Sequence, residues 1–116
     1  LVFTLVASGL GNLINGLTQQ GMIPVLVTAP GRPDDQNLAA YNTVVFRAAE
    51  AGQVPMLNAF GIGARNPSLL DGTGRLSDPG ATLRADFTDP ALSSFGVNNL
   101  LLETLRFLEV VRTRVP

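Results

Sequence analysis

The sequence predicts a three-layer α/β/α domain in which a parallel sheet lies between helices, with residues 1–116 as its C-terminal part. Two apolar segments, 23–29 and 54–60, show no alternation of apolar and polar residues, which is typical of strands covered on both faces. Helices are predicted before, between and after them, and this order favours a parallel sheet. Two parallel strands cannot form a buried sheet, so we expect the remainder of the domain or a partner chain to cover the sheet edge near Val25.

One helix is predicted ahead of each of the two strands. The first covers residues 12–20 and ends at Gly21, where a C-cap glycine belongs. An earlier start near Thr4 is the alternative, although Gly9 and Gly11 weigh against it because each costs a helix about 1 kcal/mol relative to alanine. The second helix covers residues 36–51. The apolar faces consist of Leu10, Leu13, Ile14 and Leu17 in the first helix and of Leu38, Tyr41, Val45, Ala48 and Ala49 in the second.

Short polar residues stand where helices begin. Asp34 or Asp35 precedes the second helix, and Ser93 or Ser94 precedes a third helix predicted over residues 97–111. We interpret these two serines as caps rather than nucleophiles, because the chain contains no histidine to activate a hydroxyl.

A long glycine-rich and proline-rich segment, residues 61–88, is predicted to be an irregular loop, and a loop of this length is typically functional or lid-like. It brings together several carboxylates, but their spacing does not match a calcium-binding EF-hand loop. Those carboxylates are Asp71, Asp78, Asp86 and the adjoining Asp89. We therefore expect no metal site.

Composition excludes several function classes. The net charge is −1 and the eight arginines are spread along the chain, so no basic patch for nucleic acid is expected. Without cysteine or histidine, a zinc site is improbable. The segment 9–12, Gly-Leu-Gly-Asn, lacks the third glycine of a dinucleotide-binding turn, so no cofactor is expected. The apolar start, residues 1–7, is too short to span a bilayer and is interpreted as a core strand or the start of a buried helix. The sequence leaves the cellular compartment open.

The segment 89–96, Asp-Pro-Ala-Leu-Ser-Ser-Phe-Gly, leads directly into the last predicted helix. It resembles the last conserved block of the SGNH (GDSL-type) hydrolases, in which an Asp-x-x-His pair and a glycine precede the final helix. One residue is missing between Ala91 and Leu92 relative to the usual spacing, and it is the histidine. The resemblance thus points to a family whose catalytic base this chain does not contain.

Other segments are similar to the same family in the same order. Residues 12–30 resemble its penultimate unit, a helix that ends in glycine and a strand that ends in Thr-x-Pro. Residues 41–58, which begin with Tyr-Asn and end with Val-Pro-Met-Leu-Asn, resemble its next helix and last strand. The resemblance implies the flavodoxin-like SGNH fold and ester hydrolysis by a Ser-His-Asp triad, of which this chain supplies at best the aspartate.

The resemblance implies a role for one residue, Asp89, as the acid that orients the catalytic histidine. In an alternative alignment without a gap, Asp86 is the acid and Asp89 stands at the histidine position, where a carboxylate is a weak base. Both can also be ordinary loop or capping aspartates. The predicted function is therefore an acyl-ester or carbohydrate-ester hydrolase that is inactive as this chain alone, and the alternative is a non-catalytic α/β binding or scaffold module that has lost the triad.

Overall fold

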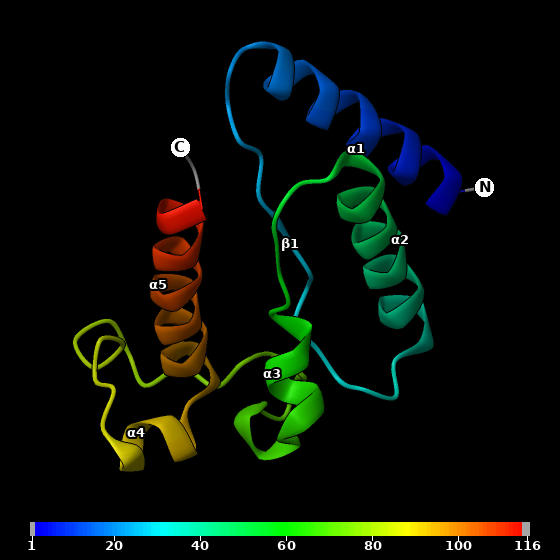
Figure 1. Ribbon diagram of the computed structural model, residues 1–116. Helices are drawn as coiled ribbons and strands as arrows, with labels where there is room; N and C mark the ends of the chain where they lie inside the picture. The colour runs from blue at the N-terminus through cyan, green and yellow to red at the C-terminus, as the bar shows by residue number, and fades with distance from the viewer. Residues whose placement is uncertain (1, 115–116) are drawn as a thin grey trace. The chain divides into compact units, whose positions relative to one another are not determined.

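The computed structural model describes residues 2–114, which form six α-helical or 3₁₀ segments and two short strands (Figure 1). In chain order they are α1 (Val2–Gln19), β1 (Leu26–Val27), α2 (Gln36–Gly52), β2 (Met56–Leu57), α3 (Phe60–Arg65), the 3₁₀ helix η1 (Pro67–Leu69), α4 (Asp89–Ser94) and α5 (Gly96–Arg114). The chain divides into two compact units. The N-terminal unit comprises Leu1–Ala29 and Asp34–Asn58, and the C-terminal unit comprises Pro30–Pro33 and Ala59–Pro116.

The predicted three-layer α/β/α sheet fold is wrong for this chain, which is mainly helical. β1 and β2 form a two-stranded sheet, and no further strand joins it within residues 2–114. The two strands pair in parallel, with Leu26 opposite Met56 and Val27 opposite Leu57. The predicted parallel pairing of the two apolar segments is thus confirmed, but only for two residues of each. An apolar segment does not by itself form a covered strand, because a sheet also needs partner strands, which the described residues do not supply.

In the N-terminal unit, α1 packs against α2 and has the earlier of the two starts considered, so it is longer than residues 12–20. Figure 1 shows α1 crossing α2 near the C-terminal end of α2. Ile14 of α1 is buried there, together with Val45 and Ala49 of α2. This tertiary packing outweighs the local cost of Gly9 and Gly11, which lie inside the helix rather than ahead of it.

The ends of α2 follow local rules. Asp35 caps its start, because its side chain accepts a hydrogen bond from the Leu38 N–H at 3.1 Å, which confirms one of the two predicted caps. At its end, Gln53 adopts the left-handed conformation with a φ of 54°, and its N–H donates to Ala49 and Glu50 carbonyls.

The C-terminal unit has its own apolar core of Ile62, Leu69 and Leu76. Partly buried Val97 and Leu100 of α5 pack against that core. The segment predicted as one long loop therefore begins with two helical segments, α3 and η1, and only the part from residue 70 to residue 88 lacks regular helix.

The predicted cap of the last helix is wrong. Ser93 and Ser94 both lie in α4, and α5 begins at Gly96. The Gly96 N–H instead donates to the hydroxyl of Ser77, at 3.2 Å. The Ser77 carbonyl also accepts from the Val97 N–H at 3.1 Å, so a distant loop residue satisfies the start of α5.

Candidate functional site

Asp89 lines a pocket of about 390 Å³ in the C-terminal unit. It is the first residue of α4, and its side chain is exposed. Helices α3, α4 and α5 all contribute to the pocket. The lining residues are Ile62, Arg65, Asn66, Leu69, Asp89, Leu92, Ser93, Asn99 and Glu103.

Leu92 stands three residues after Asp89 in the same short helix and lines the same pocket. Positions i and i+3 of a helix face the same side, so an Asp-x-x-His pair would place its histidine at residue 92 without an insertion. The gap inferred from the family spacing instead falls inside a helical turn. Ala91 is buried, and the Leu92 N–H donates to the Thr88 carbonyl at 2.9 Å, so an extra residue there would shift the turn.

Asp86 does not belong to the pocket lining. Its carboxylate accepts from the Thr88 N–H at 3.0 Å, and this backbone hydrogen bond holds the pKa of the carboxyl below its usual value. In the gapless alignment the orienting acid is Asp86, and that residue does not line this pocket.

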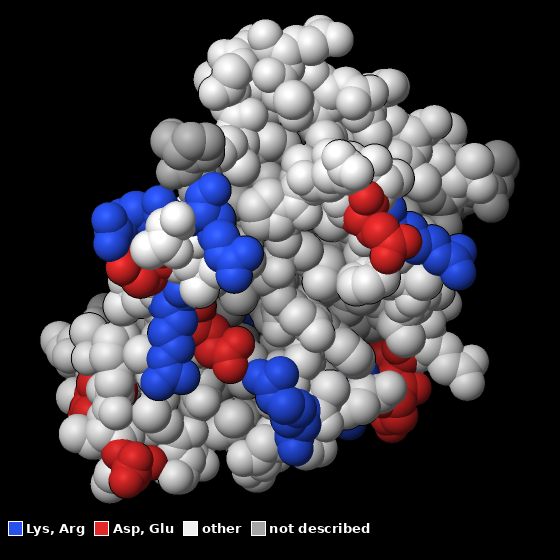
Figure 2. All heavy atoms as spheres, in the orientation of Figure 1, with Lys and Arg blue, Asp and Glu red and all other residues white. Residues whose placement is uncertain are grey.

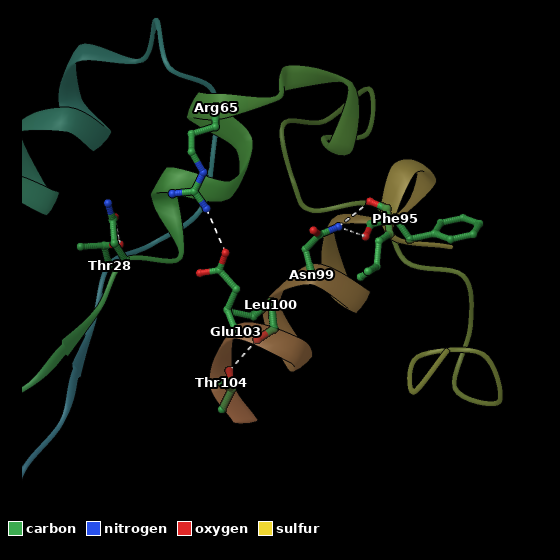
Figure 3. Close-up of polar contacts among 9 residues, drawn as sticks. Thr28, Arg65, Phe95, Asn99, Leu100, Glu103 and Thr104 are labelled. Carbon is green, nitrogen blue, oxygen red and sulfur yellow. Dashed lines mark hydrogen bonds and ion pairs between the residues drawn. The ribbon is translucent and has the colours of Figure 1, made fainter. Parts of the chain in front are cut away.

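An ion pair and an asparagine fix the polar side of the pocket (Figure 3). The Arg65 guanidinium donates to a Glu103 carboxylate oxygen at 3.0 Å and joins α3 to α5. The Asn99 amide nitrogen donates to the carbonyls of Leu92 and Phe95, at 2.7 and 3.0 Å, and joins α5 to the end of α4. Sequence spacing does not predict these residues, although two adjacent asparagines, Asn98 and Asn99, stand at the start of an amphipathic helix.

The pocket offers charged and polar groups but no imidazole. Its charged side chains are two carboxylates, Asp89 and Glu103, and one guanidinium, Arg65. Histidine is the usual general base toward a serine hydroxyl, and the sequence contains none. The arrangement can form hydrogen bonds with polar groups, but it holds no imidazole for a Ser-His-Asp triad.

A second polar cluster lies where the two strands of the N-terminal unit end. The Thr28 hydroxyl, just after β1, donates to the Asn58 side-chain oxygen, just after β2, at 2.8 Å. The Asn42 side chain bonds both the N–H and the carbonyl of Ala29, at 2.8 and 2.9 Å. Thr28 and Asn42 are buried, so these residues from the family-like segments fix the strand ends to each other and to α2.

The loop carboxylates are held by protein donors. The Thr73 hydroxyl donates to Asp71 at 2.6 Å and lowers the pKa of that carboxyl. The Arg84 side chain donates to both oxygens of Asp78, at 3.0 and 2.6 Å, and lowers the pKa of Asp78. Within residues 2–114, no group of three or more such side chains is arranged to hold a metal ion.

These carboxylates should make the C-terminal unit less stable in acid. Their pKa values are lower in the folded chain than in the unfolded chain, so their contribution is present above pH 4 and is lost as the pH falls through the folded values. Thermal unfolding followed by circular dichroism from pH 7 to pH 2.5 should show this loss. Asp78→Asn should flatten the acid limb, whereas the control Asp34→Asn should not, and equal curves for both variants would contradict the assignment.

On the face seen in Figure 2, acidic and basic side chains lie next to each other rather than in a broad area of one sign. Among the described residues of the C-terminal unit, three pairs of opposite charge are in contact: Arg65–Glu103, Arg84–Asp78 and Arg112–Glu109. In the described part of the chain, no helix has the length and apolarity needed to cross a membrane.

Comparison with known proteins finds no matching family model, no matching curated protein and no matching solved structure.

Proposed function

We propose that this chain carries the acid-bearing end of an SGNH-type ester hydrolase site, with Asp89 as the carboxylate that orients a catalytic histidine, and that the chain alone cleaves no ester. The observation that carries the proposal is the shared pocket of Asp89 and Leu92, directly ahead of Gly96 and the last helix. A Ser-His-Asp site is defined by the geometry of its groups and recurs on unrelated folds, so the proposal rests on this pocket and not on a sheet.

Asp89 would hold the histidine in one tautomer and stabilise the imidazolium that forms when the base takes the serine proton. Asn99 is not available as an oxyanion donor, because its amide nitrogen is already bonded to two carbonyls. The oxyanion donors and the nucleophile would therefore come from residues outside this pocket. An acylated small molecule or carbohydrate is the proposed substrate class.

The second candidate function is a non-catalytic binding module, and Leu92 is the observation that favours it. An apolar side chain occupies the position that the histidine would take, and the chain contains no histidine elsewhere. On either proposal, the remainder of the domain or a partner chain would cover the sheet edge, where Ile23, Val25 and Val27 are 50%, 38% and 50% exposed.

Leu92→His tests the role of Asp89 without a change of helical register. The Asp89 carboxylate should raise the pKa of the introduced imidazole above its usual value near 6.5, and Asp89→Asn in the same background should lower it again. Proton NMR titration of the C2 proton measures both values. Hydrolysis of 4-nitrophenyl acetate at pH 7 should be at background for the unchanged chain and about tenfold faster for Leu92→His, below the range of a fully positioned general base.

Ser94→His is the matched control, since residue 94 lies in the same helix but does not line the pocket. Its imidazole should keep an ordinary pKa that does not respond to Asp89→Asn. If the imidazoles at the two positions behave alike, Asp89 is not placed to orient a base, and the binding-module function replaces the hydrolase function. Esterase activity of the unchanged chain above background would refute the statement that it is inactive alone.

A further inference from the structure

An apolar groove of about 550 Å³ lies between α1 and α2 of the N-terminal unit, within the volume range of small-molecule sites. Ile14, Val44 and Ala48 supply apolar surface, and Asn15 and Arg47 supply the polar groups. All of these residues belong to one compact unit, so the groove is a feature of the α1–α2 pair itself.

Two glycines shape this groove in opposite ways. A Cβ at Gly52 would lie 2.9 Å from Ile14 Cγ2, so the two helices are in close contact at that point. A Cβ at Gly11 would meet nothing within 4 Å, although Gly11 lines the groove. The space in front of Gly11 is therefore open to a ligand.

Arg47 gives the groove a single charge without a partner. It is the one basic residue in the sequence of the N-terminal unit, and residues 1–31 contain no charged residue at all. Figure 2 shows the corresponding absence of blue and red spheres over α1. Within residues 2–114, the Arg47 side chain makes no ion pair and no hydrogen bond. The side-chain amide of Asn15 makes no hydrogen bond within these residues either.

We propose that this groove binds a free medium-chain fatty acid, with its carboxylate on Arg47 and Asn15 and its alkyl chain along Ile14, Val44 and Ala48. A guanidinium forms paired hydrogen bonds with a carboxylate, and one positive charge matches one carboxylate charge. The alkyl chain covers apolar surface of the half-buried Val44 and Ala48 that water otherwise contacts, and it lies beside Ile14, which the two helices already bury. This inference does not depend on the hydrolase function, because the two pockets share no residue.

Isothermal titration of the 116-residue chain with sodium decanoate, below its micelle concentration, tests the inference. One saturable site is expected. Each CH₂ that enters the groove should strengthen binding by about fourfold, so decanoate should bind more tightly than octanoate. Arg47→Gln should weaken decanoate binding by about tenfold or more while it leaves 1-decanol binding nearly unchanged. The control Glu50→Gln should not weaken either ligand.

Two leucine substitutions in α1 separate groove filling from a general effect on the helix. Gly11→Leu places its side chain in the open space of the groove and should abolish decanoate binding. Gly9→Leu also meets nothing within 4 Å, but residue 9 does not line the groove, so binding should be unchanged. Circular dichroism checks that both variants keep their helices. The proposal is overturned if the chain shows no saturable decanoate binding, or if the two leucine variants weaken binding equally. It is also overturned if Arg47→Gln weakens the binding of decanoate and of decanol by the same factor.

Discussion

Replacement of Gly96 by alanine should lower the free energy of unfolding of the C-terminal unit by about 2–3 kcal/mol, as expected for overpacking. A Cβ at residue 96 would lie 2.6 Å from the Leu69 carbonyl oxygen and 2.7 Å from Leu76 Cδ2. The carbonyl oxygen cannot move away easily, because it accepts from the Ser77 N–H at 2.8 Å. Alanine gains about 1 kcal/mol of helix propensity over glycine, and the backbone clash exceeds this gain.

Gly72→Ala is the control for this prediction, because a Cβ at residue 72 meets nothing within 4 Å. Gly63→Ala should have an intermediate effect, since the three atoms nearest its Cβ all belong to the side chain of Leu70, which can change rotamer. Urea denaturation of the three variants gives the comparison. A Gly96→Ala variant as stable as the control would show that the first turn of α5 does not pack against the Leu69 backbone as the structure has it.

The clash also gives the family-like block a physical explanation. The sequence resemblance aligned Gly96 with the glycine that precedes the final helix, but spacing alone gave no reason for a glycine there. The structure supplies the reason, because the helix start approaches a backbone carbonyl too closely for any side chain. Gly96 is therefore required by packing, whatever chemistry the pocket performs.

Local features of the fold were predictable because they depend on neighbours in the sequence. The periodic apolar residues of α2 and the Asp35 cap involve contacts within one or two turns. The parallel pairing of β1 and β2 followed from two apolar segments with a helix between them. Sequence periodicity could not predict how many strands join the sheet, because strand partners are set by tertiary packing.

Features that depend on distant residues were not predictable from the pattern. Glycines at 61 and 63 made α3 look like a loop, yet Ile62 is buried in the core and Gly63 lets Leu70 pack closely. Ser77 replaced the two local serines at the start of α5, and it stands 19 residues away from Gly96. In a glycine-rich segment, contacts of this range override local propensity.

The candidate site was predictable only in part. The family-like block singled out Asp89, and the structure places Asp89 in a pocket with Leu92. Arg65 and Glu103 are separated by 38 residues in the sequence, so no spacing rule could join them. Of the lining residues, the sequence thus proposed a chemical role only for Asp89, and Arg65 and Glu103 come together through the packing of α3 against α5.

Substitution of Asn98 by aspartate should have the largest effect, a loss of about 3–5 kcal/mol of unfolding free energy at pH 7, as expected for an uncompensated buried charge. Asn98 is fully buried, and its amide nitrogen donates to the carbonyls of Leu83 and Asp86, at 2.7 and 2.8 Å. Aspartate would place a negative oxygen against these two carbonyls. The Asn98 side-chain oxygen has no hydrogen-bond partner within residues 2–114, so the described residues supply no donor that would stabilise a carboxylate at this position.

The pH dependence of this variant separates its charge from its shape. Burial and the two carbonyls raise the pKa of the introduced carboxyl in the folded state above its unfolded value near 4, so the folded chain binds more protons. Its stability relative to the unchanged chain should therefore rise as the pH falls from 7 toward 4, which urea denaturation at several pH values measures.

Asn98→Leu removes the donors without a charge, and its cost of about 2–3 kcal/mol should not depend on pH. The exposed control Asn37→Asp, in the first turn of α2, should be neutral or slightly stabilising. If Asn98→Asp and Asn37→Asp are equally stable at pH 7, the Asn98 amide does not hold the loop from residue 83 to residue 86 against α5.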